Sequence, residues 1–104
     1  MASLNLSVLD QSPIHENKHP KEGLFDSIKL AKICEEEGYY RYWCAEHHDT
    51  PGYASSCPEI MVSSIANATS KIRVGSGGVM LNHYSSFKVA ETFTTLNALH
   101  NNRI

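Results

Sequence analysis

Three short apolar segments alternate along this chain with three longer segments of helical periodicity, and this order constrains the fold more than any other feature. The predicted strands cover residues 4–9, 39–45 and 72–81. The predicted helices cover residues 22–37 and 58–69, and a third helix begins at Ser85 or Ser86 and ends before Asn101. Each strand and its following helix take about 30 residues, the length of a βαβ unit. The order therefore predicts an α/β fold, a parallel βαβαβα arrangement joined by right-handed crossovers.

Residues at the predicted helix ends support these boundaries. Pro58 suits a first helical position, and Gly38 suits the position just after a helix, where left-handed backbone is favoured. Three consecutive acids, Glu35–Glu37, end the first helix, where the helix dipole disfavours negative charge. We expect them to form a solvated face that tolerates this cost. Arg103 and Ile104 follow the third helix at the point where a further strand would begin.

Composition limits the class of protein and its partners. The chain has 104 residues, 41% of them hydrophobic, which predicts a single small domain over residues 1–104. The net charge is -2 and no run of Lys or Arg occurs, so nucleic acid is not an expected partner. No apolar stretch approaches the roughly 20 residues that cross a bilayer, and the first five residues do not resemble a signal peptide. We therefore expect a cytoplasmic protein without membrane contact.

The three cysteines give no sign of a disulfide or zinc motif. Cys34, Cys44 and Cys57 are odd in number, and their spacing matches neither a zinc ribbon nor a CxxC redox motif. Cys34 lies on the apolar side of a predicted helix and Cys44 in a predicted strand, where a thiol packs as a small hydrophobic group. We expect both to be reduced and structural, and Cys57 to lie in an exposed loop.

Histidine stands where the second predicted strand ends. The segment Trp43–His48 reads WCAEHH, which places Ala45, Glu46 and His47 at the carboxyl end of a parallel strand. Loops and side chains that hold ligands converge at that end of such sheets. A histidine there is suited to proton transfer, because the ordinary pKa of imidazole is close to physiological pH.

A metal site is one alternative for this segment. Glu46, His47, His48, Asp49 and His83 are of the residue types that bind metals. Adjacent residues in extended backbone point to opposite sides, however, so His47 and His48 would rarely bind one ion together. We predict no metal ligand, and a metal-dependent hydrolase remains a minor alternative.

The glycine-rich third strand has two interpretations. Gly75, Gly77 and Gly78 weaken a strand, and glycine at such positions marks either the close approach of a ligand or tight packing. A phosphate loop would need a helix directly behind the glycines, and Val79–Leu81 intervene. The residues alone leave ligand approach and packing open.

The chain resembles the N-terminal part of the bacterial luciferase-like, flavin-dependent monooxygenases. The resemblance covers nearly all of the sequence, in matching order and spacing, through the segments LSVLDQSP, YWCAEHHD, PEIMVSSIANATSKIRVGSGGVML and HYSSFKVAETFTTLNALHNNRI. The family fold is a (β/α)8 TIM-type barrel. The resemblance implies that this chain is a single partial barrel domain, made of the first three βα units.

The resemblance also implies roles for particular residues. His47 matches the family's catalytic histidine beside the flavin ring, where it assists proton transfer, and Ala45 and Glu46 line the same strand end. Ser76–Gly77 matches the position of a non-prolyl cis peptide bond against the flavin, while Gly77 and Gly78 leave room for the ring. The implied cofactor is FMN, reduced by a separate flavin reductase.

The implied activity is a flavin-dependent monooxygenation, in which reduced FMN and oxygen oxidise a small organic substrate such as an aldehyde. The family's flavin phosphate site lies in later barrel units, so we expect the isolated chain to be incomplete. A three-stranded parallel sheet leaves edges and an apolar face uncovered. We therefore expect a homo-oligomer, or assembly with a chain that carries the missing units. The alternative is a non-catalytic barrel remnant that self-associates or binds flavin weakly.

Overall fold

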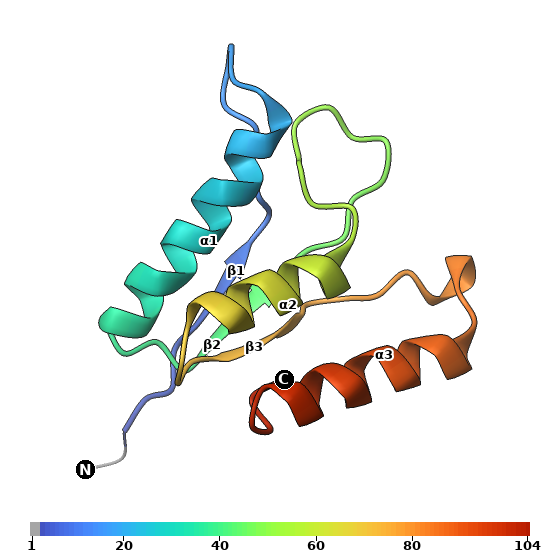
Figure 1. Ribbon diagram of the computed structural model, residues 1–104. Helices are drawn as coiled ribbons and strands as arrows, with labels where there is room; N and C mark the ends of the chain where they lie inside the picture. The colour runs from blue at the N-terminus through green and yellow to red at the C-terminus, as the bar shows by residue number, and fades with distance from the viewer. Residues whose placement is uncertain (1–2) are drawn as a thin grey trace.

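The computed structural model describes residues 3–104, which form three parallel strands, each followed by a helix (Figure 1). The elements are β1 (Ser7–Asp10), α1 (Pro20–Glu36), β2 (Arg41–Cys44), α2 (Pro58–Ala68), β3 (Arg73–Ser76), the short 3-10 helix η1 (Leu81–His83) and α3 (Ser86–Leu99). The strand order in the sheet is β1-β2-β3, with both pairs parallel. The predicted α/β fold and its βαβαβα order are confirmed. The first two residues, which belong to the predicted domain and to the segment compared with a signal peptide, lie outside the described residues.

The strands are shorter than predicted because parallel pairing ends where β2 ends. The third strand was expected to reach Leu81, but β3 stops at Ser76, the partner of Cys44. Gly77 N–H donates the next hydrogen bond to the Cys44 carbonyl at 2.8 Å, and the chain then bends away.

The first helix begins earlier than residue 22 because His19 caps it. Its Nδ1 accepts a hydrogen bond from Lys21 N–H at 3.1 Å, and the Glu22 carboxylate accepts one from His19 N–H at 2.8 Å. This reciprocal pair satisfies free donors of the first turn and allows Pro20 to start the helix. At the other end, Gly38 has a φ of 83°, as predicted for a residue that follows a helix.

The helices cover one face of the sheet and leave the other face open. In Figure 1, α1 and α2 lie on the same side of the strands. Helix α3 contacts α2. Leu9, Trp43 and Gly75 are partners across the three strands, and Leu9 is 61% exposed. A Cβ at Gly75 would lie 2.8 Å from Trp43 Cζ3, so this glycine leaves room for the indole ring. Packing is therefore the reason for glycine at this one position.

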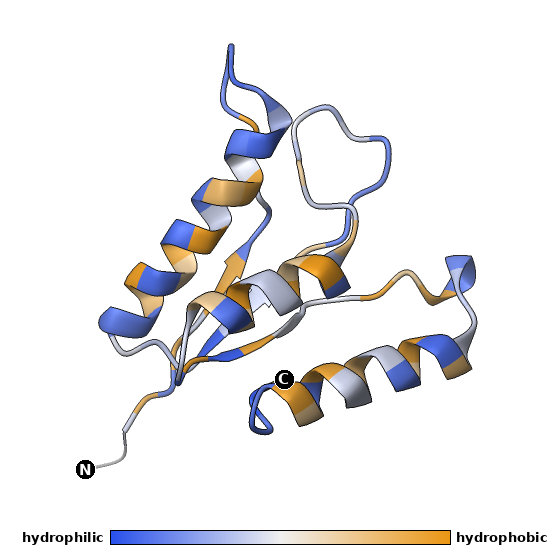
Figure 2. Cartoon of the chain, in the orientation of Figure 1, coloured by the Kyte–Doolittle hydropathy of each residue, from blue (hydrophilic) through white to orange (hydrophobic). Residues whose placement is uncertain are grey.

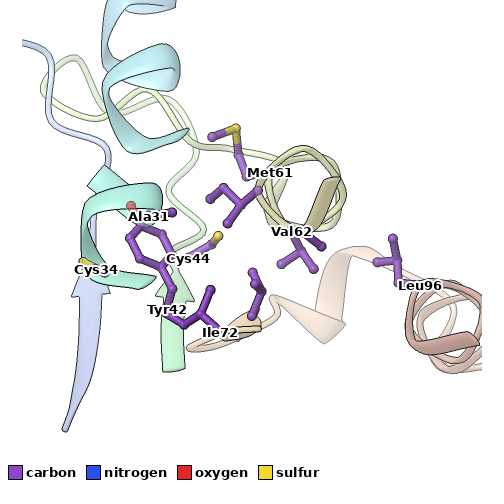
Figure 3. Close-up of a cluster of buried hydrophobic side chains, with 11 residues drawn as sticks. Ala31, Cys34, Tyr42, Cys44, Met61, Val62, Ile72 and Leu96 are labelled. Carbon is purple, nitrogen blue, oxygen red and sulfur yellow. The ribbon is translucent and has the colours of Figure 1, made fainter. Parts of the chain in front are cut away.

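The covered face holds the hydrophobic core (Figure 3). Tyr42, Val62, Ile65 and Val74 are almost completely buried between the sheet and α2. Figure 2 shows hydrophobic and hydrophilic residues alternating along α1, in keeping with a helix that packs on one side. The buried side of α1 does not include all of its apolar residues, since Phe25 and Ile33 are exposed.

A buried polar network joins β1, β2 and α1 beneath the carboxyl ends of the strands. The Tyr42 hydroxyl donates to the Asp10 carboxylate, and Asp10 Oδ1 accepts Ser12 N–H at 3.0 Å. Ser12 Oγ lies 2.7 Å from Ser27 Oγ, and Ser27 in turn donates to the Gly23 carbonyl. Burial and the Asp10 carboxylate raise the pKa of Tyr42 far above its usual range, so the hydroxyl keeps its proton. The network fixes the turn that follows β1.

The cysteines are free, with Cys34 and Cys44 buried and Cys57 exposed, as predicted. Burial and the nearby Asp10 carboxylate raise the pKa of Cys44 to about 12, which keeps the thiol protonated and unreactive. No helix among the described residues has the length and apolar character needed to cross a membrane.

Arg103 lies against the outer edge of β3 and the end of α2. Its carbonyl accepts Val74 N–H at 3.0 Å, which is one hydrogen bond of the kind that a further parallel strand would make. The guanidinium donates to the carbonyls of Ala66 at 2.6 Å and Ile72 at 2.9 Å. Arg103 thus supplies the positive charge that the carboxyl end of α2 otherwise lacks.

The expectation that the acids at the end of α1 form a merely solvated face is wrong for Glu35. Its Oε2 accepts hydrogen bonds from Ser70 N–H at 2.9 Å, Lys71 N–H at 2.6 Å and Ile72 N–H at 2.9 Å. Partial burial raises the pKa of Glu35, but these three donors outweigh it and hold the pKa below its usual value. The carboxylate therefore fixes the start of β3 against α1.

We predict that Glu35→Gln lowers the free energy of unfolding by about 1.5–3 kcal/mol at pH 7, the range for hydrogen bonds to a charged group. Because the pKa of Glu35 is lower in the folded state, its stabilisation is present above the unfolded value of about 4.3 and is lost as the pH falls through the folded value. The difference from the parent chain should shrink below about pH 4. Urea unfolding at several pH values measures it. The control is Glu36→Gln, at the exposed neighbouring position. An equal decrease in the free energy of unfolding for this variant would contradict the account.

Candidate functional site

A cavity of about 550 Å³ lies at the carboxyl ends of all three strands. Such a volume is within the range of small-molecule sites, and this end of a parallel sheet is where ligands bind. The lining residues come from the exits of β1, β2 and β3: Leu9, Gln11, Trp43, Cys44, Ala45, Glu46, His47, Gly77, Gly78, Val79 and Met80. The structure therefore brings Ala45, Glu46, His47, Gly77 and Gly78, all predicted site residues, to one cavity.

His47 lies at the rim of the cavity and is held by residues from two loops. Its Nε2 is 3.1 Å from Gln11 Oε1, and its ring stacks on Tyr53 with centroids 4.5 Å apart and planes at 27°. Its backbone N–H donates to the Ser55 carbonyl at 3.0 Å. The imidazole is half-buried, so it can exchange protons both with a bound ligand and with water.

Glu46 joins the exit of β2 to the segment after β3. Its side chain is 2% exposed, and Oε2 is 2.6 Å from His48 Nε2 and 2.9 Å from the Tyr84 hydroxyl, which donates to it. Burial raises the pKa of Glu46, but the bonds from His48 and Tyr84 hold it below its usual value. The hydrogen bond from the Tyr84 hydroxyl to Glu46 raises the pKa of Tyr84 to about 12. The charged carboxylate is thus bound to other parts of the protein through both of its oxygens.

The glycine-rich segment forms the third side of the cavity. A Cβ at Gly78 would meet nothing within 4 Å, whereas one at Gly77 would lie 3.3 Å from Leu9 Cδ1. Gly78 therefore leaves open space beside its backbone, in contrast to the packed glycine at position 75. Ser76, the remaining predicted residue, does not line the cavity, and its hydroxyl donates to the Gly78 carbonyl instead.

The expectation of a cis peptide bond between Ser76 and Gly77 is wrong for this structure. No cis bond occurs within residues 3–104. A trans bond lets Gly77 N–H continue the ladder to the Cys44 carbonyl at 2.8 Å, and the trans form is favoured by about 3 kcal/mol for a bond not involving proline.

His47 and His48 point to different neighbours, as their adjacent positions predict. His48 contacts Glu46 and packs edge-on against His83 with ring centroids 5.2 Å apart, while His47 contacts Gln11 and Tyr53. In the part of the chain that the structure describes, no three His, Cys, Asp or Glu side chains gather as a metal site would need. The hydrolase alternative therefore has no ligand set there.

Sequence reasoning missed the contributions of β1 to the site. Leu9 and Gln11 follow the same rule that identified His47, since both stand at the carboxyl end of a parallel strand. Trp43, Val79 and Met80 complete a wall that is mainly apolar. A flat aromatic ligand can pack against these side chains and the bare backbone of Gly78, within reach of the His47 imidazole.

The family model described as "Luciferase-like monooxygenase" matches residues 4–104. Among curated relatives, an N-acetyl-S-alkylcysteine monooxygenase of Bacillus subtilis is 50% identical over 101 residues, which are 97% of this chain and 30% of that protein. The chain thus spans about 30% of the length of the curated relatives that it matches.

Two solved structures share the fold. The crystal structure of apo-MsnO8 is 49% identical with a TM-score of 0.94, and the alignment covers 98% of this chain and 31% of that one. The oxygenating constituent of 3,6-diketocamphane monooxygenase from Pseudomonas putida, in complex with FMN, is 17% identical with a TM-score of 0.90 and covers 98% and 28%. The three βα units thus match the start of TIM-barrel monooxygenases, as predicted. With the family model matched over nearly the whole sequence, the chain belongs to the luciferase-like monooxygenase family.

Proposed function

We propose that this chain forms one wall of a flavin site, with the ring system in the cavity at the strand ends and His47 at its rim. The observation that carries the proposal is that His47 and the open backbone at Gly78 line the same cavity, although they are 31 positions apart (78 − 47) and follow different strands. The FMN held by the Pseudomonas putida structure of the same fold supports the choice of ligand.

The residues present fit the ring of a flavin better than its phosphate. Leu9, Trp43, Val79 and Met80 offer apolar contacts to a planar ring, and Gly78 allows it to approach the backbone. Neither Lys nor Arg is found among the described residues that line the cavity. We infer that the phosphate of FMN is held by other parts of a complete barrel.

Bound reduced flavin would supply the activation of oxygen for the oxidation of a small organic substrate such as an aldehyde. His47 then accepts or returns a proton at the ring edge, and Ala45 and Glu46 hold the strand exit. Gly78 gives the ring room, while Gly77 packs beside Leu9 at the cavity wall. The contribution of Ser76 is indirect, through its bond to the Gly78 carbonyl. A separate flavin reductase supplies the reduced cofactor, and three free thiols suit a reducing compartment such as the cytoplasm.

We further propose that a second copy of the chain, or a chain with further barrel units, covers the open face of the sheet. Leu9 on that face is 61% exposed, and large exposed apolar surfaces favour association. Light scattering should therefore give a mass of at least twice 11.6 kDa. Leu9→Lys should shift the chain toward the monomer, because it places charge on the covered face. A monomer at every concentration would contradict self-association.

The flavin proposal predicts that riboflavin and FMN bind this chain with similar affinity, because the cavity contacts the ring alone. Quenching of flavin fluorescence measures both. Gly78→Val should weaken binding at least about tenfold, or about 1.4 kcal/mol, since its methyl groups occupy the space left for the ring. His47→Gln should alter binding less than Gly78→Val.

Gly52→Val is the matched control, because position 52 also has open surroundings but lies away from the cavity. Equal losses in the two glycine variants would contradict the proposed ring position. Absence of quenching by either flavin at high concentration would favour the alternative of a non-catalytic remnant.

A further inference from the structure

The His47 ring has two side-chain partners, Gln11 and Tyr53, and the family resemblance assigns a function to neither. Gln11 Oε1 lies 3.1 Å from Nε2, and the Tyr53 ring stacks at 4.5 Å. Gln11 belongs to the loop after β1, and Tyr53 to the long loop after β2. Stacking on Tyr53 therefore fixes the plane of the imidazole, and the contact with Gln11 fixes the position of Nε2.

The two loops that carry these partners are bound to each other. Ala54 N–H donates to the Ser12 carbonyl at 2.8 Å, and Ile14 N–H donates to the Gly52 carbonyl at 2.9 Å. Pro13 and Tyr53 form an isolated antiparallel bridge between these bonds. The loops thus hold Gln11 at the ring edge of His47 and Tyr53 on its face.

Helix α1 supports this pair of loops from below. Gly23 is buried, and a Cβ there would lie 2.8 Å from the Pro13 carbonyl oxygen and 3.3 Å from Ala54 Cβ. Glycine in a helix is less favourable than alanine, so its presence here is explained by the close approach of the loops. Gly23 therefore allows the loops that carry the partners of His47 to pack close to α1.

The chemistry of the amide determines what this arrangement does. A neutral imidazole has one N–H and one lone pair, and an amide oxygen can only accept a hydrogen bond. Nε2 must therefore carry the proton when it bonds to Gln11 Oε1, which leaves the lone pair on Nδ1. A proton taken up at Nδ1 gives an imidazolium that keeps its bond to Gln11.

We propose that Gln11 and Tyr53 are positioning residues for His47, and that Gln11 fixes the tautomer in which Nδ1 is the proton-accepting atom. The catalytic meaning of this assignment rests on the proposed function. The tautomer itself is a property of the chain without flavin.

The test is the tautomer of His47 in the flavin-free chain, from two-bond proton–nitrogen NMR spectra about two pH units above the ordinary histidine pKa of about 6.5. The parent chain should show one tautomer, with hydrogen on Nε2. Gln11→Leu should give a mixture of both tautomers, since an apolar side chain selects neither. Gln11→Glu should restore the single tautomer and raise the titration midpoint of the ring by about one pH unit, because a carboxylate stabilises the imidazolium.

Tyr53→Ala should broaden the His47 ring signals, and Tyr53→Phe should leave them sharp, because phenylalanine keeps the stacked ring. Hydrogen on Nδ1 in the parent chain, or an unchanged tautomer ratio in Gln11→Leu, would overturn the proposal. Since no flavin is present, failure of flavin binding would leave this result intact and would count against the proposed function alone.

Discussion

The buried bond from the Tyr42 hydroxyl to the Asp10 carboxylate is the interaction on which the arrangement of the site depends. It joins Tyr42 of β2 to Asp10, the last residue of β1, and the same carboxylate accepts a hydrogen bond from Ser12 N–H in the turn that follows β1. Leaving either group without its partner in this buried position would cost about 1–3 kcal/mol. The turn carries Gln11 toward His47, so a structural bond in the core determines the position of a side chain in the cavity.

The site results from what parallel strands place at one edge of a sheet, together with a few contacts between their loops. β2 delivers His47, β3 delivers the glycine backbone, and β1 delivers Leu9 and Gln11. Glu46 and Glu35 act in the same way at different places, since each uses a carboxylate to bind backbone of a later segment, near Met80 and at residues 70–72. The segments before and after β3 are therefore positioned by charge-assisted hydrogen bonds, while the sheet itself is held by apolar packing on one face.

The sequence alone predicted those features that depend on local periodicity or on the rule for strand ends. The βαβαβα order, the cap at Gly38 and the placement of His47 beside Gly77 and Gly78 belong to this group. Contacts between distant residues were not predictable, because no local pattern encodes that Glu35 meets the backbone at residues 70–72 or that Gln11 meets His47. The cis bond implied between Ser76 and Gly77 was wrong for a related reason. The hydrogen bond from Gly77 N–H to the Cys44 carbonyl goes with the trans form, and this contact is between distant residues.

The central claim is that the cavity at the strand ends receives a flavin ring. A titration of the isotopically labelled chain with riboflavin, followed by amide NMR shifts, tests it most directly. The account predicts that ring-current shifts centre on His47, Gly78 and Met80, which lie on two different strand exits. Shifts that centre instead on the smaller hollow of about 220 Å³ between α2 and α3, lined by Lys88 and Phe93, would contradict it.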